Sequence, residues 1–157
     1  MSESDSGTWQ LALATLADTE ALGRRIAAKL RPNDSVLLDG PLGAGKTTLA
    51  RALIRALCDD PCMDVPSPSY TLVQAYESSA GTVSHFDLWR LDGPAGLPEL
   101  GWDEARDGMV VVEWPDRLQS LRPHDALVVH LEPVPGDEGR RSATLSGWPG
   151  RWGRGPG

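Results

Sequence analysis

Apolar residues recur along this chain at two periods, which predict strands in some segments and helices in others. The run 35–39 is short and apolar at its three middle positions, which indicates a strand. The uninterrupted apolar run in 109–113 is typical of a central strand buried on both faces. Segment 48–57 carries an apolar residue at every third or fourth position and is therefore expected to be a helix. The chain thus alternates strand and helix, as α/β folds do.

The segment before the first of these strands predicts another helix. Asp18 or Thr19 can cap its amino end, and Pro32 stops it from continuing. Its apolar stripe, at intervals of four residues, consists of Leu22, Ile26 and Leu30. A weak alternation over 9–15 predicts a first strand at or near a sheet edge.

Two hairpins are expected later in the chain. Their strands are 70–77 with 82–89, and 126–132 with 140–146. Hairpins are antiparallel, so we predict a mixed sheet that is mainly parallel at its centre. Segment 58–68 is rich in Asp and Pro and is expected to be an exposed loop.

The motif with the clearest chemistry is Gly-Pro-Leu-Gly-Ala-Gly-Lys-Thr at positions 40–47, between strand 35–39 and helix 48–57. It fits the phosphate-binding loop G-x-x-x-x-G-K-[ST]. Gly43 and Gly45 can adopt a positive φ, so that backbone N–H groups turn toward a β-phosphate at the positive end of the helix. The predicted nucleotide-binding residues of this motif are Gly43, Ala44, Gly45, Lys46, Thr47 and Thr48.

Three side chains of the motif have separate tasks in this prediction. Lys46 would reach the β- and γ-phosphate oxygens, Thr47 would offer its hydroxyl to Mg²⁺, and Thr48 would contact a phosphate nearer the sugar. The plain alternative is a glycine turn before a core helix. The strand and helix on either side favour nucleotide binding, and the sequence then predicts a three-layer P-loop NTPase fold.

A phosphate-binding loop needs an acidic residue at the end of a neighbouring strand, to bind Mg²⁺ and to orient the attacking water. Asp87 follows the strand-like 82–86, and Glu113 ends the apolar run 109–113. Both carboxylates are therefore candidate catalytic and metal-binding residues, although each could be a solvated strand terminus. His85 would point to the same face as Asp87, where a structural role is favoured.

Two further candidates have open alternatives. In segment 67–71, Pro68 and three hydroxyl residues could form a switch that presents Ser69 or Thr71 to a γ-phosphate, or simply a capped strand entry. Trp114 could be a wall of the nucleotide pocket, although its residue type favours packing in the core.

Size and charge limit the remaining possibilities. The chain has 157 residues and a net charge of −7, which fits one domain, 1–146, and disfavours tight direct binding of a nucleic acid. The last eleven residues, 147–157, hold five Gly and two Pro and are expected to be a disordered tail.

The amino-terminal residues are polar and no segment has the apolar length of a membrane span, so we expect a cytoplasmic protein with no membrane contact. Cys58 and Cys62 are expected to be free thiols.

The order and spacing of these motifs over about 19–141 resemble the TsaE (YjeE) family, the small ATPase of bacterial tRNA threonylcarbamoyladenosine biosynthesis. The matching stretches are Thr-x-x-Leu-Gly-x-x-Ile-Ala at 19–27, 40–48, Ser-Pro-Ser-Tyr-Thr-Leu-Val at 67–73, His-Phe-Asp-Leu-Trp-Arg-Leu at 85–91 and Val-Glu-Trp-Pro at 112–115. Three positions depart from the usual family residues: Pro41, Ser69 and Trp89 replace an acidic residue, Thr and Tyr.

The resemblance implies ATP and Mg²⁺ as cofactors, a switch role for Ser69 to Thr71, and Mg²⁺-linked roles for Asp87 and Glu113. It also implies action with the TsaB–TsaD complex, after TsaC has made threonylcarbamoyl-adenylate, so that tRNA is reached only through partners. Three alternative functions are also compatible with a nucleotide-binding loop: a small-molecule kinase, a GTPase switch, and a nucleotide-gated interaction module without turnover. The GTPase reading is weakened because no N-K-x-D motif occurs and Asn33 is the only Asn.

Overall fold

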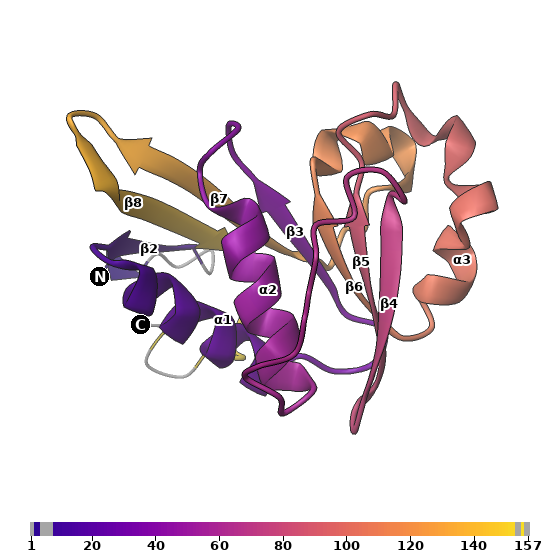
Figure 1. Ribbon diagram of the computed structural model, residues 1–157, viewed down its shortest axis with the longest axis horizontal. Helices are drawn as coiled ribbons and strands as arrows, with labels where there is room; N and C mark the ends of the chain where they lie inside the picture. The colour runs from indigo at the N-terminus through magenta and orange to yellow at the C-terminus, as the bar shows by residue number, and fades with distance from the viewer. Residues whose placement is uncertain (1, 4–7, 153–154, 156–157) are drawn as a thin grey trace.

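A mixed, eight-stranded sheet forms the centre of the computed structural model, which describes residues 2–3, 8–152 and 155 (Figure 1). The strand order is β1-β2-β8-β7-β3-β6-β5-β4. The strands are β1 (Ser2–Glu3), β2 (Thr8–Leu13), β3 (Ser35–Asp39), β4 (Val73–Ser78), β5 (Gly81–Asp87), β6 (Met109–Glu113), β7 (Leu127–Val134) and β8 (Asp137–Ser146). The helices are α1 (Leu16–Lys29), α2 (Lys46–Leu57) and the short α3 (Trp102–Ala105), with 3₁₀ segments at Pro94–Gly96, Pro98–Leu100 and Pro115–Leu121.

The middle of the sheet is parallel and its flanks are antiparallel. β3 pairs in parallel with β6 and with β7, and β5 pairs in parallel with β6. The hairpins β4–β5 and β7–β8 are antiparallel, as predicted. The predicted strands 35–39 and 109–113 have the bounds of β3 and β6, and the predicted central place of 109–113 is confirmed. Both strands lie inside the sheet, where their side chains are buried on both faces.

Helices cover both faces of the sheet, so the prediction of a three-layer α/β fold is confirmed. On one face α1 and α2 lie side by side and share a core with apolar side chains of β3, β6, β7 and β8 (Figure 1). On the other face α3 and the 3₁₀ segments enclose a second core, in which Phe86 and Trp102 meet edge to face with ring centroids 5.1 Å apart. Within the described residues, no helix combines the length and the apolar character that crossing a bilayer requires.

The amino end of α1 differs from its prediction. The cap is Thr15, whose extended backbone precedes the helix, and neither Asp18 nor Thr19 takes that position. Thr15 Oγ1 accepts a hydrogen bond from Asp18 N at 3.2 Å, and Asp18 Oδ2 in turn accepts one from Thr15 N at 3.2 Å. This reciprocal pair is a capping box, in which Asp18 stabilises the helix from inside its first turn.

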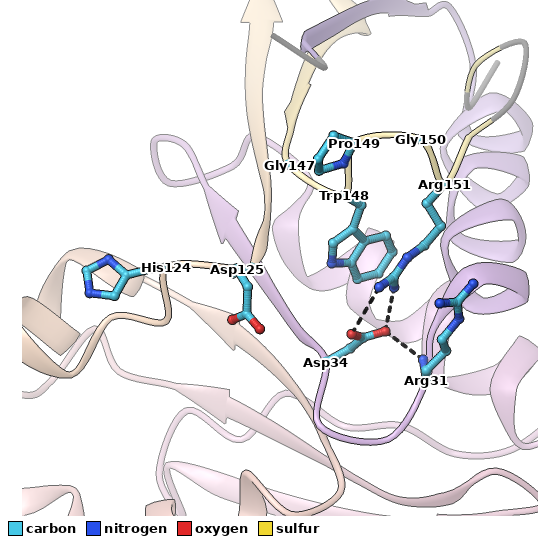
Figure 2. Close-up of a pocket in the computed structure, with 10 residues that line it drawn as sticks. Arg31, Asp34, His124, Asp125, Gly147, Trp148, Pro149, Gly150 and Arg151 are labelled. Atoms are coloured by element: carbon cyan, nitrogen blue, oxygen red, sulfur yellow. Dashed lines mark hydrogen bonds and ion pairs between the residues drawn. The ribbon is translucent and has the colours of Figure 1, made fainter.

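The prediction of a disordered tail is wrong for residues 147–152, which are packed against the domain. Trp148 and Trp152 are only 4% and 7% exposed, and their rings stack with centroids 5.7 Å apart. Arg151 crosses over the ring of Trp148 and places Nη1 2.6 Å from Asp34 Oδ2 (Figure 2). The buried aromatic area holds this segment in place despite its Gly and Pro content. The rest of the predicted tail, apart from Gly155, lies outside the described residues.

Candidate active site

The site lies where the carboxyl ends of β3, β5 and β6 meet the amino end of α2. A cleft of about 1000 Å³ opens there. Crevices at the carboxyl ends of parallel strands are the usual ligand sites of open α/β sheets. The lining residues include Gly43, Gly45, Lys46, Thr47, Thr48, Ser69, Asp87, Glu113 and Trp114. These predicted site residues, which are spread over some seventy positions in the sequence, therefore share one cavity.

The loop 40–45 has the backbone shape that its glycines predict. Gly43 and Gly45 adopt φ values of 81° and 100°, a region that L side chains rarely enter. Gly45 directly precedes α2, so the first N–H groups of that helix, which have no partner inside it, face the loop. This arrangement provides backbone donors and a partial positive charge for a bound phosphate.

Ala44 has a different place from the one predicted. Its side chain is buried under the loop, and its N–H donates to Pro41 O at 3.1 Å. It is also absent from the residues that line the cleft, whereas both neighbouring glycines are present. Ala44 therefore packs the loop against the core, and its own N–H is already occupied.

Lys46 forms part of the floor of the cleft and is only 5% exposed. Its Nζ donates to Gly40 O and, at 3.0 Å, to Pro41 O, and it lies 4.1 Å from the centroid of the Trp114 ring. Burial lowers the pKa of Lys46, and the nearby carboxylates, Glu113 foremost, partly oppose that effect. The buried ammonium group of Lys46, at the amino end of α2, is suited to bind a phosphate as a point charge.

Thr47 joins the loop to the carboxylate of β6. Its Oγ1 donates to Glu113 Oε1 at 2.8 Å, and the other carboxylate oxygen, Oε2, lies 2.7 Å from His85 Nε2. A carboxylate only accepts, so the proton of this second bond belongs to His85. Both side chains of that pair are almost fully buried. His85 thus has the structural role that the sequence favours, and the group that it holds in place is Glu113.

Asp87 lies beside Glu113, because the two residues are register partners on the parallel strands β5 and β6. Asp87 is buried, and its Oδ1 accepts a hydrogen bond from Trp89 N at 3.3 Å. Burial raises the pKa of Asp87, and the charge of Glu113 raises it further. Two neighbouring carboxylates with a threonine hydroxyl are hard oxygen donors of the kind that Mg²⁺ prefers.

The described residues contain no group of three or more His, Cys, Asp and Glu side chains arranged to hold a metal ion by themselves. This finding is compatible with Mg²⁺, which is usually bound by one or two carboxylates together with substrate phosphates. Cys58 and Cys62 are free thiols, as predicted.

Trp114 combines the two roles that the sequence left open. It packs against the second core, and it also lines the cleft beside Lys46. Its backbone is left-handed, with φ 59° and ψ 56°, which is uncommon for a bulky residue. This turn sends the chain from β6 into the 3₁₀ segment that starts at Pro115 and aims the indole at the loop.

The predicted switch segment is only partly at the cleft. Ser69 and Ser67 line it, and their hydroxyl oxygens lie 2.8 Å apart. Thr71 is exposed and is not among the described residues that line the cleft, so the structure does not bring it to the site. The reason is a turn at Leu72, which has φ 69° and donates its N–H to Pro68 O at 2.7 Å.

Sequence reasoning missed several residues at the rim of the cleft. Leu42 is 86% exposed there, and Trp89, Arg90 and Arg141 also line the rim. Tyr70, which is 88% exposed, lies there too, but it belongs to the predicted switch segment 67–71. Trp89 and Arg90 could have been found, because they directly follow the Asp87 motif in the sequence. Arg141 could not, since it reaches the loop from β8 and contacts a carbonyl 97 positions away.

A strand, a glycine-rich loop and a helix that together face carboxylates on two neighbouring strands define a P-loop nucleotide-binding fold. The crystal structure of YdiB from Bacillus subtilis has a similar fold, with a TM-score of 0.70 and 23% identity, and the match covers 89% of this chain and 85% of YdiB. The family described as "Threonylcarbamoyl adenosine biosynthesis protein TsaE" matches residues 13–142, and the chain belongs to this family.

Individual relatives agree with this membership. The chain is 37% identical over 129 residues to the tRNA threonylcarbamoyladenosine biosynthesis protein TsaE of Rickettsia felis. The aligned residues cover 82% of this chain and 74% of that relative. It is also 37% identical over 109 residues to the protein of that name in Aquifex aeolicus, which covers 69% and 77%. The resemblance seen in the sequence motifs is thereby confirmed, and the family places the chain in tRNA threonylcarbamoyladenosine biosynthesis.

Proposed function

We propose that this chain binds Mg-ATP in the cleft and hydrolyses it slowly. The observation that carries the proposal is the hydrogen bond of 2.8 Å between Thr47 and Glu113, because it joins the phosphate-binding loop to a carboxylate at a strand end. Nucleotide hydrolysis by P-loop proteins needs these two parts in one place. The two are 66 positions apart in the sequence, so a glycine turn with no function would not require them to meet.

Each side chain has a defined task in this proposal. The Lys46 ammonium would bind phosphate oxygens in place of the carbonyls of Gly40 and Pro41, and Ser69 would contact the terminal phosphate. Thr47, Asp87 and Glu113 would hold Mg²⁺, which neutralises charge on the phosphates when it is bound. His85 keeps the Glu113 carboxylate oriented. Trp114, beside Lys46, forms a wall for the nucleotide.

The purpose of hydrolysis follows from the family. We propose that it supports threonylcarbamoylation of the adenosine next to the anticodon in tRNAs that read ANN codons, together with TsaB, TsaC and TsaD. The net charge of −7 disfavours direct contact with a polyanion, so the tRNA would be held by the partner proteins. We expect the TsaB–TsaD complex to be the direct partner.

The kinase alternative is less well supported. A kinase of this size needs basic side chains that close over the transferred phosphate. Arg140 instead pairs with Asp137 at 2.9 Å, and Arg141 donates to backbone carbonyls of the loop. Arg90, at the rim of the cleft, lies over the Tyr70 ring, and a single arginine there is not a basic lid. A nucleotide-gated module without turnover keeps the same binding site and differs only in hydrolysis.

Reconstitution tests the proposal. Threonylcarbamoyl transfer to tRNA is measured over many turnovers with TsaB, TsaC and TsaD, in the presence of this chain, of its Lys46→Ala variant, or of neither. Phosphate release is followed in the same reactions. We expect sustained modification only with the parent chain. Equal product without it would refute the role in modification, and product without phosphate release would favour the non-hydrolysing module.

A further inference from the structure

Arg141, at the rim of the cleft, contacts the backbone of the phosphate-binding loop. It lies on β8, on the same face as the buried residues Ala143 and Leu145, and this is the face that α2 covers. Its Nε donates to Ala44 O at 3.1 Å and its Nη2 donates to Gly43 O at 3.2 Å. One guanidinium group therefore donates to two successive carbonyl groups of the loop, those of Gly43 and Ala44.

These two contacts fix the orientation of two peptide planes. The described residues contain no cis peptide, and in a trans peptide the C=O and N–H bonds point in opposite directions. The carbonyl of Ala44 belongs to the same peptide as the N–H of Gly45. Because Arg141 holds that carbonyl, the Gly45 N–H is directed away from Arg141.

We infer that Arg141 is a positioning residue, which keeps the loop in the shape that binds a β-phosphate. The inference rests on the proposed binding of a nucleotide in the cleft. It assigns Arg141 to the loop carbonyls and not to the base or the sugar of the nucleotide. An arginine suits this task, because its rigid fork donates to two acceptors at once, whereas a lysine is a single point charge on a flexible stem.

The neighbouring residue provides a matched control. Arg140 has the same charge and lies on the same strand, but its side chain belongs to the opposite face. It forms an exposed ion pair with Asp137, with 2.9 Å between Arg140 Nε and Asp137 Oδ2. Arg140→Gln thus removes one positive charge from the same region without a change at the loop.

The experiment compares the dissociation constants of ADP and AMP by calorimetry for the parent, Arg141→Gln, Arg141→Lys and Arg140→Gln. We expect the ADP constant to rise about tenfold for Arg141→Gln, because charge-assisted bonds that order the loop are lost. For Arg141→Lys we expect a rise of about threefold, since one contact can be kept. The constants of Arg140→Gln should stay within about twofold of the parent, because exposed pairs contribute little.

AMP separates positioning of the loop from other roles. It lacks the β-phosphate, so its dissociation constant should be almost the same in all four proteins. An equal loss for AMP and ADP would overturn the inference, because it would point to contact with the base or sugar or to general damage. The calorimetric stoichiometry reports the folded fraction, and Arg141→Lys gives the decisive comparison where Arg141→Gln does not fold.

The result also distinguishes this inference from the proposed function. A parent chain that binds no ADP would refute the proposed function itself. A parent that binds ADP, with both Arg141 variants unchanged, would leave the proposed function intact and overturn only the role of Arg141.

Discussion

Replacement of Lys46 by methionine tests the nucleotide site with little change in shape. Methionine is unbranched and of similar length, so it can keep the packing under the Trp114 ring while the charge is removed. Nζ donates to the carbonyls of Gly40 and Pro41. The variant therefore loses those two contacts as well as any contact to phosphate.

The expected magnitude follows from these contacts. An ammonium about 4 Å from one phosphate charge gains about 4 kcal/mol at an effective dielectric constant of about 20. To bind phosphate, Lys46 gives up two carbonyl bonds of about 1 kcal/mol each. The net contribution is about 2 kcal/mol, which corresponds to an ATP dissociation constant about 30-fold higher in Lys46→Met.

The assay is calorimetric titration with Mg-ATP, accompanied by thermal melting. The control is Lys29→Met, because Lys29 is the only other lysine of the chain and is exposed at the end of α1. Burial lowers the pKa of Lys46, so the folded protein disfavours its charge, and loss of that cost offsets the loss of the two carbonyl bonds in Lys46→Met. The melting temperature should therefore stay close to that of the parent. Parent-like affinity in Lys46→Met would refute the assignment of the cleft as a phosphate site.

Three other substitutions test different parts of the structure. Glu113→Gln is expected to lower kcat by about 100-fold while the dissociation constant for ATP changes by less than about threefold, because Glu113 would act on the metal and the attacking water; parallel turnover and binding measurements check this. Asp87→Asn is expected to raise the free energy of unfolding at neutral pH. Burial and the charge of Glu113 raise the pKa of Asp87, so the folded state disfavours the ionised carboxylate that Asn replaces. The gain in stability should vanish at a pH well below 3.8, the ordinary pKa of Asp, because the carboxyl group is then protonated in the folded and the unfolded state. Thermal melts without Mg²⁺ at neutral pH and at that low pH measure the difference. Trp148→Ala should lower the free energy of unfolding by about 3 kcal/mol or more, whereas Trp89→Ala, at a half-exposed position, should change it by less than about 0.5 kcal/mol in the same denaturant titrations.

The parts of the fold that the sequence predicts well are those with strong local patterns. β3 and β6 are apolar on both faces, and α2 repeats its leucines at helical spacing. The spacing of apolar residues is therefore enough to assign these segments as strands and helix. The phosphate-binding loop has a fixed spacing of glycines and lysine. Asp87 and Glu113 follow from the rule that ligands bind at the carboxyl ends of parallel strands.

The parts that were missed depend on contacts between distant segments. Thr15, Asp18 and Thr19 are all good caps, and only the start of the helix decides among them. The composition of segment 147–152 suggests a tail, but its two tryptophans pack against the apolar core and Arg151 forms an ion pair with Asp34. No pattern in the neighbouring sequence predicts these contacts, and none predicts that Arg141 contacts the phosphate-binding loop.

The site collects features that are individually unfavourable to the fold. Asp87 and Glu113 are buried side by side, Lys46 is a buried cation whose pKa is lowered, and Trp114 has a left-handed backbone. Such features persist where the surrounding structure holds them, and they concentrate at functional sites. All of them face one cleft between the same loop and the same two strands, so a single ligand with a divalent cation and phosphate oxygens could neutralise the carboxylates and the lysine together. A purely structural turn before α2 would give no reason for the chain to place an acid pair, a lysine and an indole around it.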